Sequence, residues 1–158
     1  DYTAVEWFGR GPQENYADRK TSAFVGRYRS TVADQFFPYV SPQESGYRTE
    51  IRWVALTRPD GHGILACGLP LVCFSALPYT SEDLTQERRG SKHPTDLKAR
   101  PFVEWSIDYG QMGVGGDDSW GAKIHPQYRL LEKKYVYSFR IRPVGKDDDI
   151  LKLAREKL

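Results

Sequence analysis

The chain contains 158 residues, 39% of them hydrophobic and 28% charged, and its formal net charge at pH 7 is +2. This length corresponds to one domain or a large part of one. The interspersed charges exclude the basic stripe of a nucleic-acid-binding protein and the polybasic segment of a membrane-binding one. The longest apolar run, residues 64–77, is interrupted by Gly68, Pro70 and Ser75 and is too short to span a bilayer. We therefore expect no nucleic acid and no membrane among the partners.

The hydrophobic pattern of the first half predicts short strands separated by turns. Residues 2–8 and 23–32 are expected to form the first two strands, and residues 15–22 between them a short helical turn. Residues 47–56 alternate clearly and predict a half-buried strand. The first face of this strand is expected to be buried and the second charged: Tyr47, Thr49, Ile51, Trp53 and Ala55 against Arg48, Glu50 and Arg52.

Glycine and proline divide the second half of the chain. Residues 64–67 and 72–77 are predicted to be two separate strands because Gly68 and Pro70 interrupt them. A Ser or Thr followed by acidic residues predicts a short helix at residues 81–84. The remaining expected elements are strands at residues 102–109 and 135–141 and a short amphipathic helix in the tail, residues 146–158.

This pattern totals about seven or eight strands and two or three short helices, without the regularly alternating helices that parallel βαβ units require. We therefore predict an all-β fold, an antiparallel β-sandwich formed by residues 1–145 and followed by the tail. Cys67 and Cys73 lack the spacing of metal ligands and are expected to be buried free thiols, with a hairpin disulfide as the alternative.

The stretch from residue 113 to residue 121 has the most distinctive composition, because four glycines, two carboxylates and one hydroxyl surround a single tryptophan. Glycines permit positive φ, and Asp and Ser side chains hold loops by bonding to backbone amides, so a shaped loop is predicted. Trp120 on such a loop would offer a flat platform that suits the apolar face of a sugar ring. The alternative is that Trp120 packs back onto the core. The residues expected to shape the loop are Gly113, Gly115, Gly116 and Asp117.

The sequence alone predicts no catalytic pair and no metal site. Glycoside hydrolysis needs two carboxylates that flank the scissile bond, and the side chains of the neighbours Asp117 and Asp118 diverge. The three histidines lie in separate loops without a nearby ligand partner. The other glutamates considered are scattered along the chain, and the sequence cannot show whether they converge: Glu14, Glu44 and Glu104.

Three segments together resemble one enzyme family. Residues 7–19, 38–48 and 112–120 are similar to signatures of the C-terminal small-chain domain of bacterial β-galactosidases in glycoside hydrolase family 2. Their order and rough spacing also fit, and the resemblance covers about residues 2–144. It implies a galactose-mutarotase-like sandwich, of which this chain is similar to the C-terminal half.

The resemblance implies a division of labour between domains. The family's catalytic glutamates lie on a TIM barrel elsewhere in the polypeptide, so the isolated chain is expected to be inactive, and Mg²⁺ and Na⁺ bind mainly elsewhere. The implied partners are the remaining domains of the parent enzyme and galactosides such as lactose. The family's matching tryptophan stacks on the sugar, which implies the same for Trp120, with Asp118 and Ser119 beside it. A structural or interdomain role is expected for Gln13, Glu14, Asn15 and Arg19.

Two other functions stay open at this stage. A stand-alone carbohydrate-binding module would bind galactosides without other domains. A mutarotase-like aldose epimerase would need a convergent acid and base. We also expect an exposed hydrophobic surface, covered by homo-oligomerisation or by the tail helix. No signal peptide is visible. Because the chain opens like the middle of a longer sequence, we interpret it as a fragment or a processed chain. Its compartment, cytoplasmic or periplasmic in a bacterium, is left open.

Overall fold

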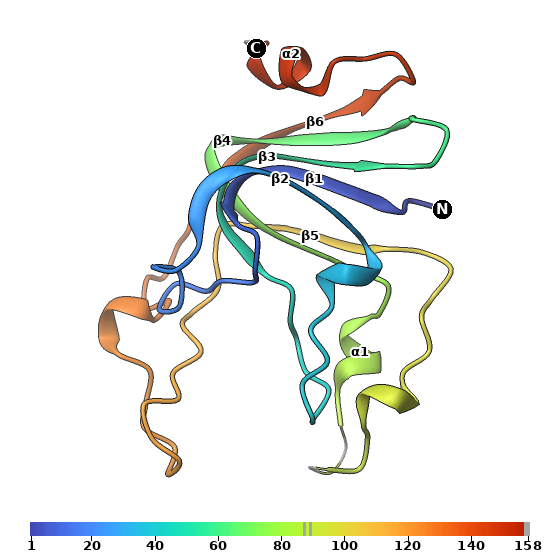
Figure 1. Cartoon of the computed structure of the whole chain (residues 1–158). Helices are drawn as coiled ribbons and strands as arrows, with labels where there is room; N and C mark the ends of the chain where they lie inside the picture. The colour runs from blue at the N-terminus through green and yellow to red at the C-terminus, as the bar shows by residue number, and fades with distance from the viewer. Residues whose placement is uncertain (87, 89, 157–158) are drawn as a thin grey trace.

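The fold is a single antiparallel β-sheet with its long loops on one side (Figure 1). The computed structural model describes residues 1–86, 88 and 90–156. Within these residues the sheet has six strands in the order β2-β1-β3-β4-β5, and β6 also pairs with β4. The strands are β1 (Ala4–Gly11), β2 (Phe24–Thr31), β3 (Arg48–Thr57), β4 (Gly63–Leu77), β5 (Glu104–Asp108) and β6 (Ser138–Val144).

Helices are few and short in the described part of the chain. They are α1 (Ser81–Leu84), α2 (Ile150–Arg155) and three 3-10 turns at Ala33–Gln35, Pro94–Asp96 and Pro126–Tyr128. The expected helix at 81–84 is confirmed, and Thr80 caps it by accepting a hydrogen bond from the amide of Asp83 at 3.2 Å. α2 lies in the tail for which the sequence predicts a helix, and Asp149 caps it. These elements confirm the all-β antiparallel class.

The long strand β4 gives the sheet its shape. It pairs with β6 over residues 63–69 and with β5 over residues 73–77, and it bends between these two parts. Ala66 and Phe74, from opposite sides of the bend, lie in the same core cluster with Val5 and Trp7. A sheet that folds over a shared core in this way is consistent with the predicted sandwich.

Three details of the sequence interpretation are wrong. Residues 15–22 form no helical turn, because the backbones of Tyr16 and Arg19 bond to each other at 2.9 and 3.3 Å and make a tight loop. Gly68 and Pro70 bend β4 without ending it, so one strand replaces two. β6 starts later than predicted and continues through Pro143.

The five residues at 47–55 that the alternation predicts to be buried are buried, but the predicted division of β3 into one buried and one charged face fails because the strand is irregular. Its register with β4 shifts on both sides of Ile51, and Glu50 has a φ of 56°. As a result the buried residues divide between two faces, with Ile51 in the main core and Trp53 in a second cluster with Leu153 of α2. β3 is therefore covered on both sides, and Figure 1 shows α2 outside β6 and β4.

Candidate functional site

The glycine-rich segment that follows β5 is a long loop that extends from the sheet on the side away from α2 (Figure 1). Gly115, Gly116 and Gly121 have φ values of 66°, 88° and 87°, a region that side chains rarely adopt. Trp120 is 93% exposed, so it does not pack onto the core. An indole presented to solvent on a shaped loop is available to a ligand or to another domain.

Asp118 holds the backbone around Trp120. Its Oδ1 accepts hydrogen bonds from the amide of Trp120 at 2.8 Å and from the amide of Ala122 at 3.1 Å. This Asp turn commits one carboxylate oxygen to the shape of the loop. Ser119, the third residue predicted to touch a substrate, is exposed beside Trp120.

Asp18 joins the loop at residues 13–19 to the tryptophan loop, although sequence reasoning did not single it out. Its carboxylate accepts hydrogen bonds from the amides of Val114 at 3.0 Å and Gly115 at 2.9 Å. Burial raises the pKa of Asp18, but these amides and the charge of Arg19 outweigh burial and hold the pKa below its usual value. Arg19 also donates to the carbonyl of Gly115. The loop at 13–19 is therefore the support on which the tryptophan loop rests.

Gly113 has a steric role at this junction. A Cβ at this position would lie 2.5 Å from Oδ2 of Asp18. The amide of Gly113 donates to the carbonyl of Tyr128 at 2.7 Å, which ties the beginning of the loop to its return segment. A side chain at position 113 would therefore displace the carboxylate that holds the loop.

Asp117 forms a charged cluster on the surface of the loop. It is hydrogen-bonded to the ring of His125, and its Oδ1 lies 3.6 Å from the guanidinium of Arg19. The hydrogen bond with His125 is the main cause of the lowered pKa of Asp117. The structure thus brings together a carboxylate and an imidazole, the type of acid and base that the epimerase alternative requires, although both side chains are exposed.

The polar residues at 13–15 make hydrogen bonds within the domain. Asn15 is fully buried, and its Oδ1 accepts from the amide of Thr49 at 3.1 Å and from the hydroxyl of Thr49 at 2.6 Å. Glu14 accepts from the amide of Gly46 at 2.7 Å and from two tyrosine hydroxyls. The side-chain amide of Gln13 donates to the carbonyl of Ser22 at 3.2 Å. These bonds fix the loop that carries Asp18.

Arg48, which the alternating pattern places on an exposed face, is only 4% exposed. It donates to the carbonyls of Pro12 at 3.1 Å and Gly46 at 2.6 Å, and its guanidinium lies 5.3 Å from the ring centre of Trp7. Burial lowers its pKa to about 10, which the charge of Glu14 partly opposes. Its position in the segment 38–48 was the only sequence signal for this role.

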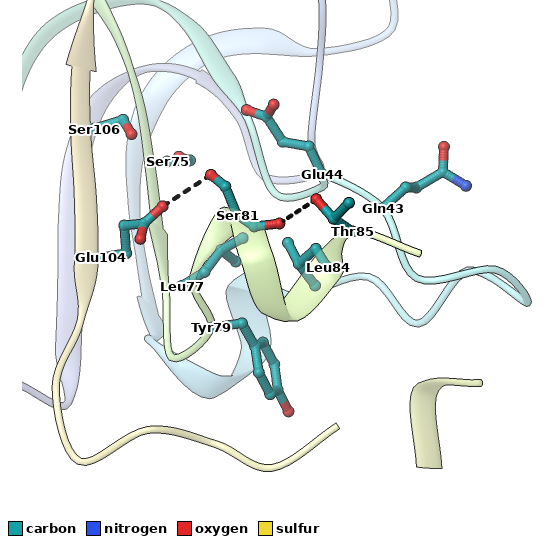
Figure 2. A pocket seen from close by; sticks show the side chains of 10 residues that line it. All are labelled: Gln43, Glu44, Ser75, Leu77, Tyr79, Ser81, Leu84, Thr85, Glu104 and Ser106. Atoms are coloured by element: carbon teal, nitrogen blue, oxygen red, sulfur yellow. Dashed lines mark hydrogen bonds between the residues drawn. The ribbon is translucent and has the colours of Figure 1, made fainter. Parts of the chain in front are cut away.

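Two of the scattered glutamates line one cavity of about 320 Å³ (Figure 2). Glu104 of β5 accepts a hydrogen bond from the hydroxyl of Ser81 at 3.1 Å, and Glu44 accepts one from the amide of Gln111. Glu14 lies elsewhere, bound to tyrosines. Within residues 1–86, 88 and 90–156, no group of three His, Cys, Asp or Glu side chains is placed to hold a metal ion.

Two further findings describe the chain in general. Cys67 and Cys73 are buried free thiols, as predicted. Among the described residues, no helix has both the length and the apolar character needed to cross a membrane.

Comparison with known proteins decides the family. A family model described as the β-galactosidase small chain matches residues 1–141. The chain belongs to this family. The three segments that carry Asn15, Arg48 and Trp120 all lie within the matched range. The small-chain family therefore includes both the tryptophan loop and the loop that supports it.

Curated relatives show how this small chain compares with whole proteins. It is 42% identical over 144 residues to a β-galactosidase of Priestia megaterium, which covers 90% of the chain and 14% of that protein. It is 42% identical over 132 residues to a β-galactosidase of Halalkalibacterium halodurans, covering 82% of the chain and 12% of that protein. A β-galactosidase of Vibrio cholerae is 39% identical over 140 residues, with 87% and 12% covered. The chain therefore spans about one-seventh or less of these relatives.

Proposed function

We propose that this chain is a domain of a β-galactosidase that hydrolyses terminal non-reducing β-D-galactose residues. It would contribute Trp120 to a sugar site whose catalytic groups lie on another domain. The observation that carries the proposal is the exposure of Trp120 on a loop held by Asp118 and Asp18. A flat indole on a rigid support binds the apolar face of a sugar with little loss of conformational entropy.

The chemistry is proposed to belong to the rest of the parent, a member of glycoside hydrolase family 2 acting with retention. Around Trp120 the charged groups form the cluster of Asp117, His125 and Arg19, with Asp118 turned to the backbone. A retaining hydrolase needs two carboxyl groups about 5 Å apart on either side of the bond to be broken. We infer that the loop supplies binding and leaves bond cleavage to groups on another domain. Mg²⁺ and Na⁺, which the resemblance implies, would also bind mainly elsewhere.

The isolated chain tests the division of labour. We expect it to release no nitrophenol from a nitrophenyl β-galactoside, while the parent enzyme hydrolyses the same compound with retained anomeric configuration. Activity of the isolated chain would overturn the proposal. In that case Glu44→Gln and Glu104→Gln would show whether the cavity in Figure 2 is responsible, because both glutamates line it.

A second candidate function is aldose epimerisation, which the contact between Asp117 and His125 favours. An epimerase needs a base that takes the proton of the anomeric hydroxyl and an acid that protonates the ring oxygen of the sugar. Measuring the rate at which α-galactose equilibrates with β-galactose tests this function. A rate above that of buffer that is lost in Asp117→Asn would favour the epimerase, and an unchanged rate would exclude it.

A further inference from the structure

A second cavity, of about 390 Å³, lies where four elements meet. Its walls come from the bend of β4 at residues 69–73, the irregular part of β3 at residues 49–50, the residues that follow β5, and the residues that precede β6. This volume falls in the range of pockets that enclose small ligands. Neither Trp120 nor the two glutamates of Figure 2 contribute to its lining.

Aromatic rings form one wall of this cavity. Tyr109 and Tyr137 both line it, with ring centres 6.2 Å apart and planes at 63°. Tyr135 and Phe139 extend the row on either side, at 5.1 Å from Tyr109 and 5.7 Å from Tyr137. The hydroxyl of Tyr137 donates to the carbonyl of Ile107 at 3.1 Å, which fixes the orientation of its ring. Tyr109 and Tyr137 remain about half exposed, so their faces are open to a ligand.

The lining of the cavity also carries an ion pair. Glu50 accepts from the ammonium of Lys20 at 2.6 Å and from the guanidinium of Arg10 at 2.8 Å, and both Lys20 and Glu50 line the cavity. Burial raises the pKa of Glu50, but Lys20 and Arg10 outweigh it and lower the pKa, so the carboxylate is ionised. Free N–H groups of Lys20 and lone pairs of Glu50 remain for a ligand.

Glu50 reaches the lining through an unfavourable backbone conformation. Its φ of 56° lies in the left-handed region, and it sits where the register between β3 and β4 shifts. Such irregularities redirect a side chain and are common beside binding sites.

We propose that this cavity is a second saccharide site, which binds a neutral pyranose ring. The apolar face of the ring would lie on Tyr109 and Tyr137. Of two adjacent hydroxyls of the sugar, one would donate a hydrogen bond to the carboxylate of Glu50, and the other would accept one from the ammonium of Lys20. Lys20 and Glu50 are the charged residues of the lining, and their opposite charges balance within it, which favours a neutral polyhydroxylated ligand over a carboxylate or an amine. This site goes beyond the proposed role of Trp120 and does not depend on it.

Titration of the 158-residue chain with methyl β-galactoside and with lactose, followed by saturation-transfer NMR and calorimetry, tests the proposal. We expect saturable binding whose Kd rises about tenfold or more in Tyr109→Ala and in Glu50→Gln. Phe24→Ala removes an exposed ring outside the cavity and is expected to keep the wild-type Kd, and Trp120→Ala is titrated beside it. Thermal unfolding of each variant shows whether it is folded, and Tyr109→Leu, which also lacks the ring, replaces Tyr109→Ala if the latter is not.

Two results would overturn the proposal. The first is the absence of saturable binding of either sugar by the folded chain. The second is binding that Trp120→Ala abolishes while Tyr109→Ala and Glu50→Gln leave it unchanged. The second result would support a sugar-binding Trp120, so failure of this inference is distinguishable from failure of the proposed function.

Discussion

The carboxylate of Asp18 accepts a hydrogen bond of 2.9 Å from the amide of Gly115, a residue 97 positions further along the chain. Through this bond, the loop that follows β1 fixes the loop that presents Trp120. The side chain of Asp18, which fixes the loop, is buried, whereas Trp120, which the loop presents, is exposed. A binding platform is useful only if its position is fixed before the ligand arrives.

Removal of the Asp18 carboxylate is expected to release the tryptophan loop. Asp18→Ala leaves the amides of Val114 and Gly115 without their acceptor, and should destabilise the fold by about 1–3 kcal/mol. Urea unfolding measures this loss, and limited proteolysis should cut within residues 113–125 before elsewhere. Thr31→Ala, which removes an exposed hydroxyl bonded to Asp34, serves as the control. Equal proteolysis of wild type and Asp18→Ala would contradict the role of Asp18.

The pH dependence of stability follows from the same carboxylate. The pKa of Asp18 is lower in the folded chain than in the unfolded chain, where it is near 4. Its contribution to the free energy of unfolding is therefore complete above about pH 4 and is lost as the pH falls through the folded pKa. Urea unfolding at pH 7 and at pH 3 should show a smaller loss of stability in Asp18→Asn than in the wild type. An identical loss in both proteins would show that Asp18 is not responsible.

Glycine at position 113 is expected to be required by sterics. Gly113→Ala places a Cβ against the carboxylate of Asp18 and should cost about 1–3 kcal/mol of stability. Gly110→Ala is the matched control, since its Cβ meets no atom within 4 Å, and it should change stability by less than about 0.5 kcal/mol. Denaturant unfolding compares the two. Similar values for both variants would contradict the steric argument.

The tail helix is expected to stabilise the sheet that it covers. Leu153 is 7% exposed and packs in a cluster with Trp53 and Leu65, while Arg140 donates to its carbonyl at 3.0 Å. Leu153→Ala should destabilise the chain by about 2–4 kcal/mol. Leu131→Ala, at an exposed position, is the control and should have little effect. If both changes cost the same in denaturant unfolding, α2 does not cover the sheet in solution.

Local patterns predicted much of the fold but little of how the site is held together. The strands, the capped helix at residues 81–84 and the shaped loop around Trp120 depend on neighbouring residues, and the sequence shows them. The burial of Arg48 depends on carbonyls of Pro12 and Gly46, and the role of Asp18 depends on a loop almost 100 positions away.

The irregularity of β3 explains the largest error about a strand. Alternation predicts faces only while the pairing register is constant. The register shifts around Ile51 depend on the bend of β4 at residues 68–71, which local reading interprets as a break between strands. For the same reason, the alternating pattern assigns Glu50 to a solvent-facing side of the strand, although this residue lines the second cavity.

The central claim is that Trp120 binds sugar in a site completed by other domains. Trp120→Ala in the parent β-galactosidase, assayed for lactose hydrolysis, tests it most directly. Phe24→Ala, which removes an exposed aromatic ring on β2, is the matched control. The account predicts that the KM for lactose rises about tenfold or more in Trp120→Ala and is unchanged in Phe24→Ala. Unchanged KM and kcat in a folded Trp120→Ala enzyme would contradict it.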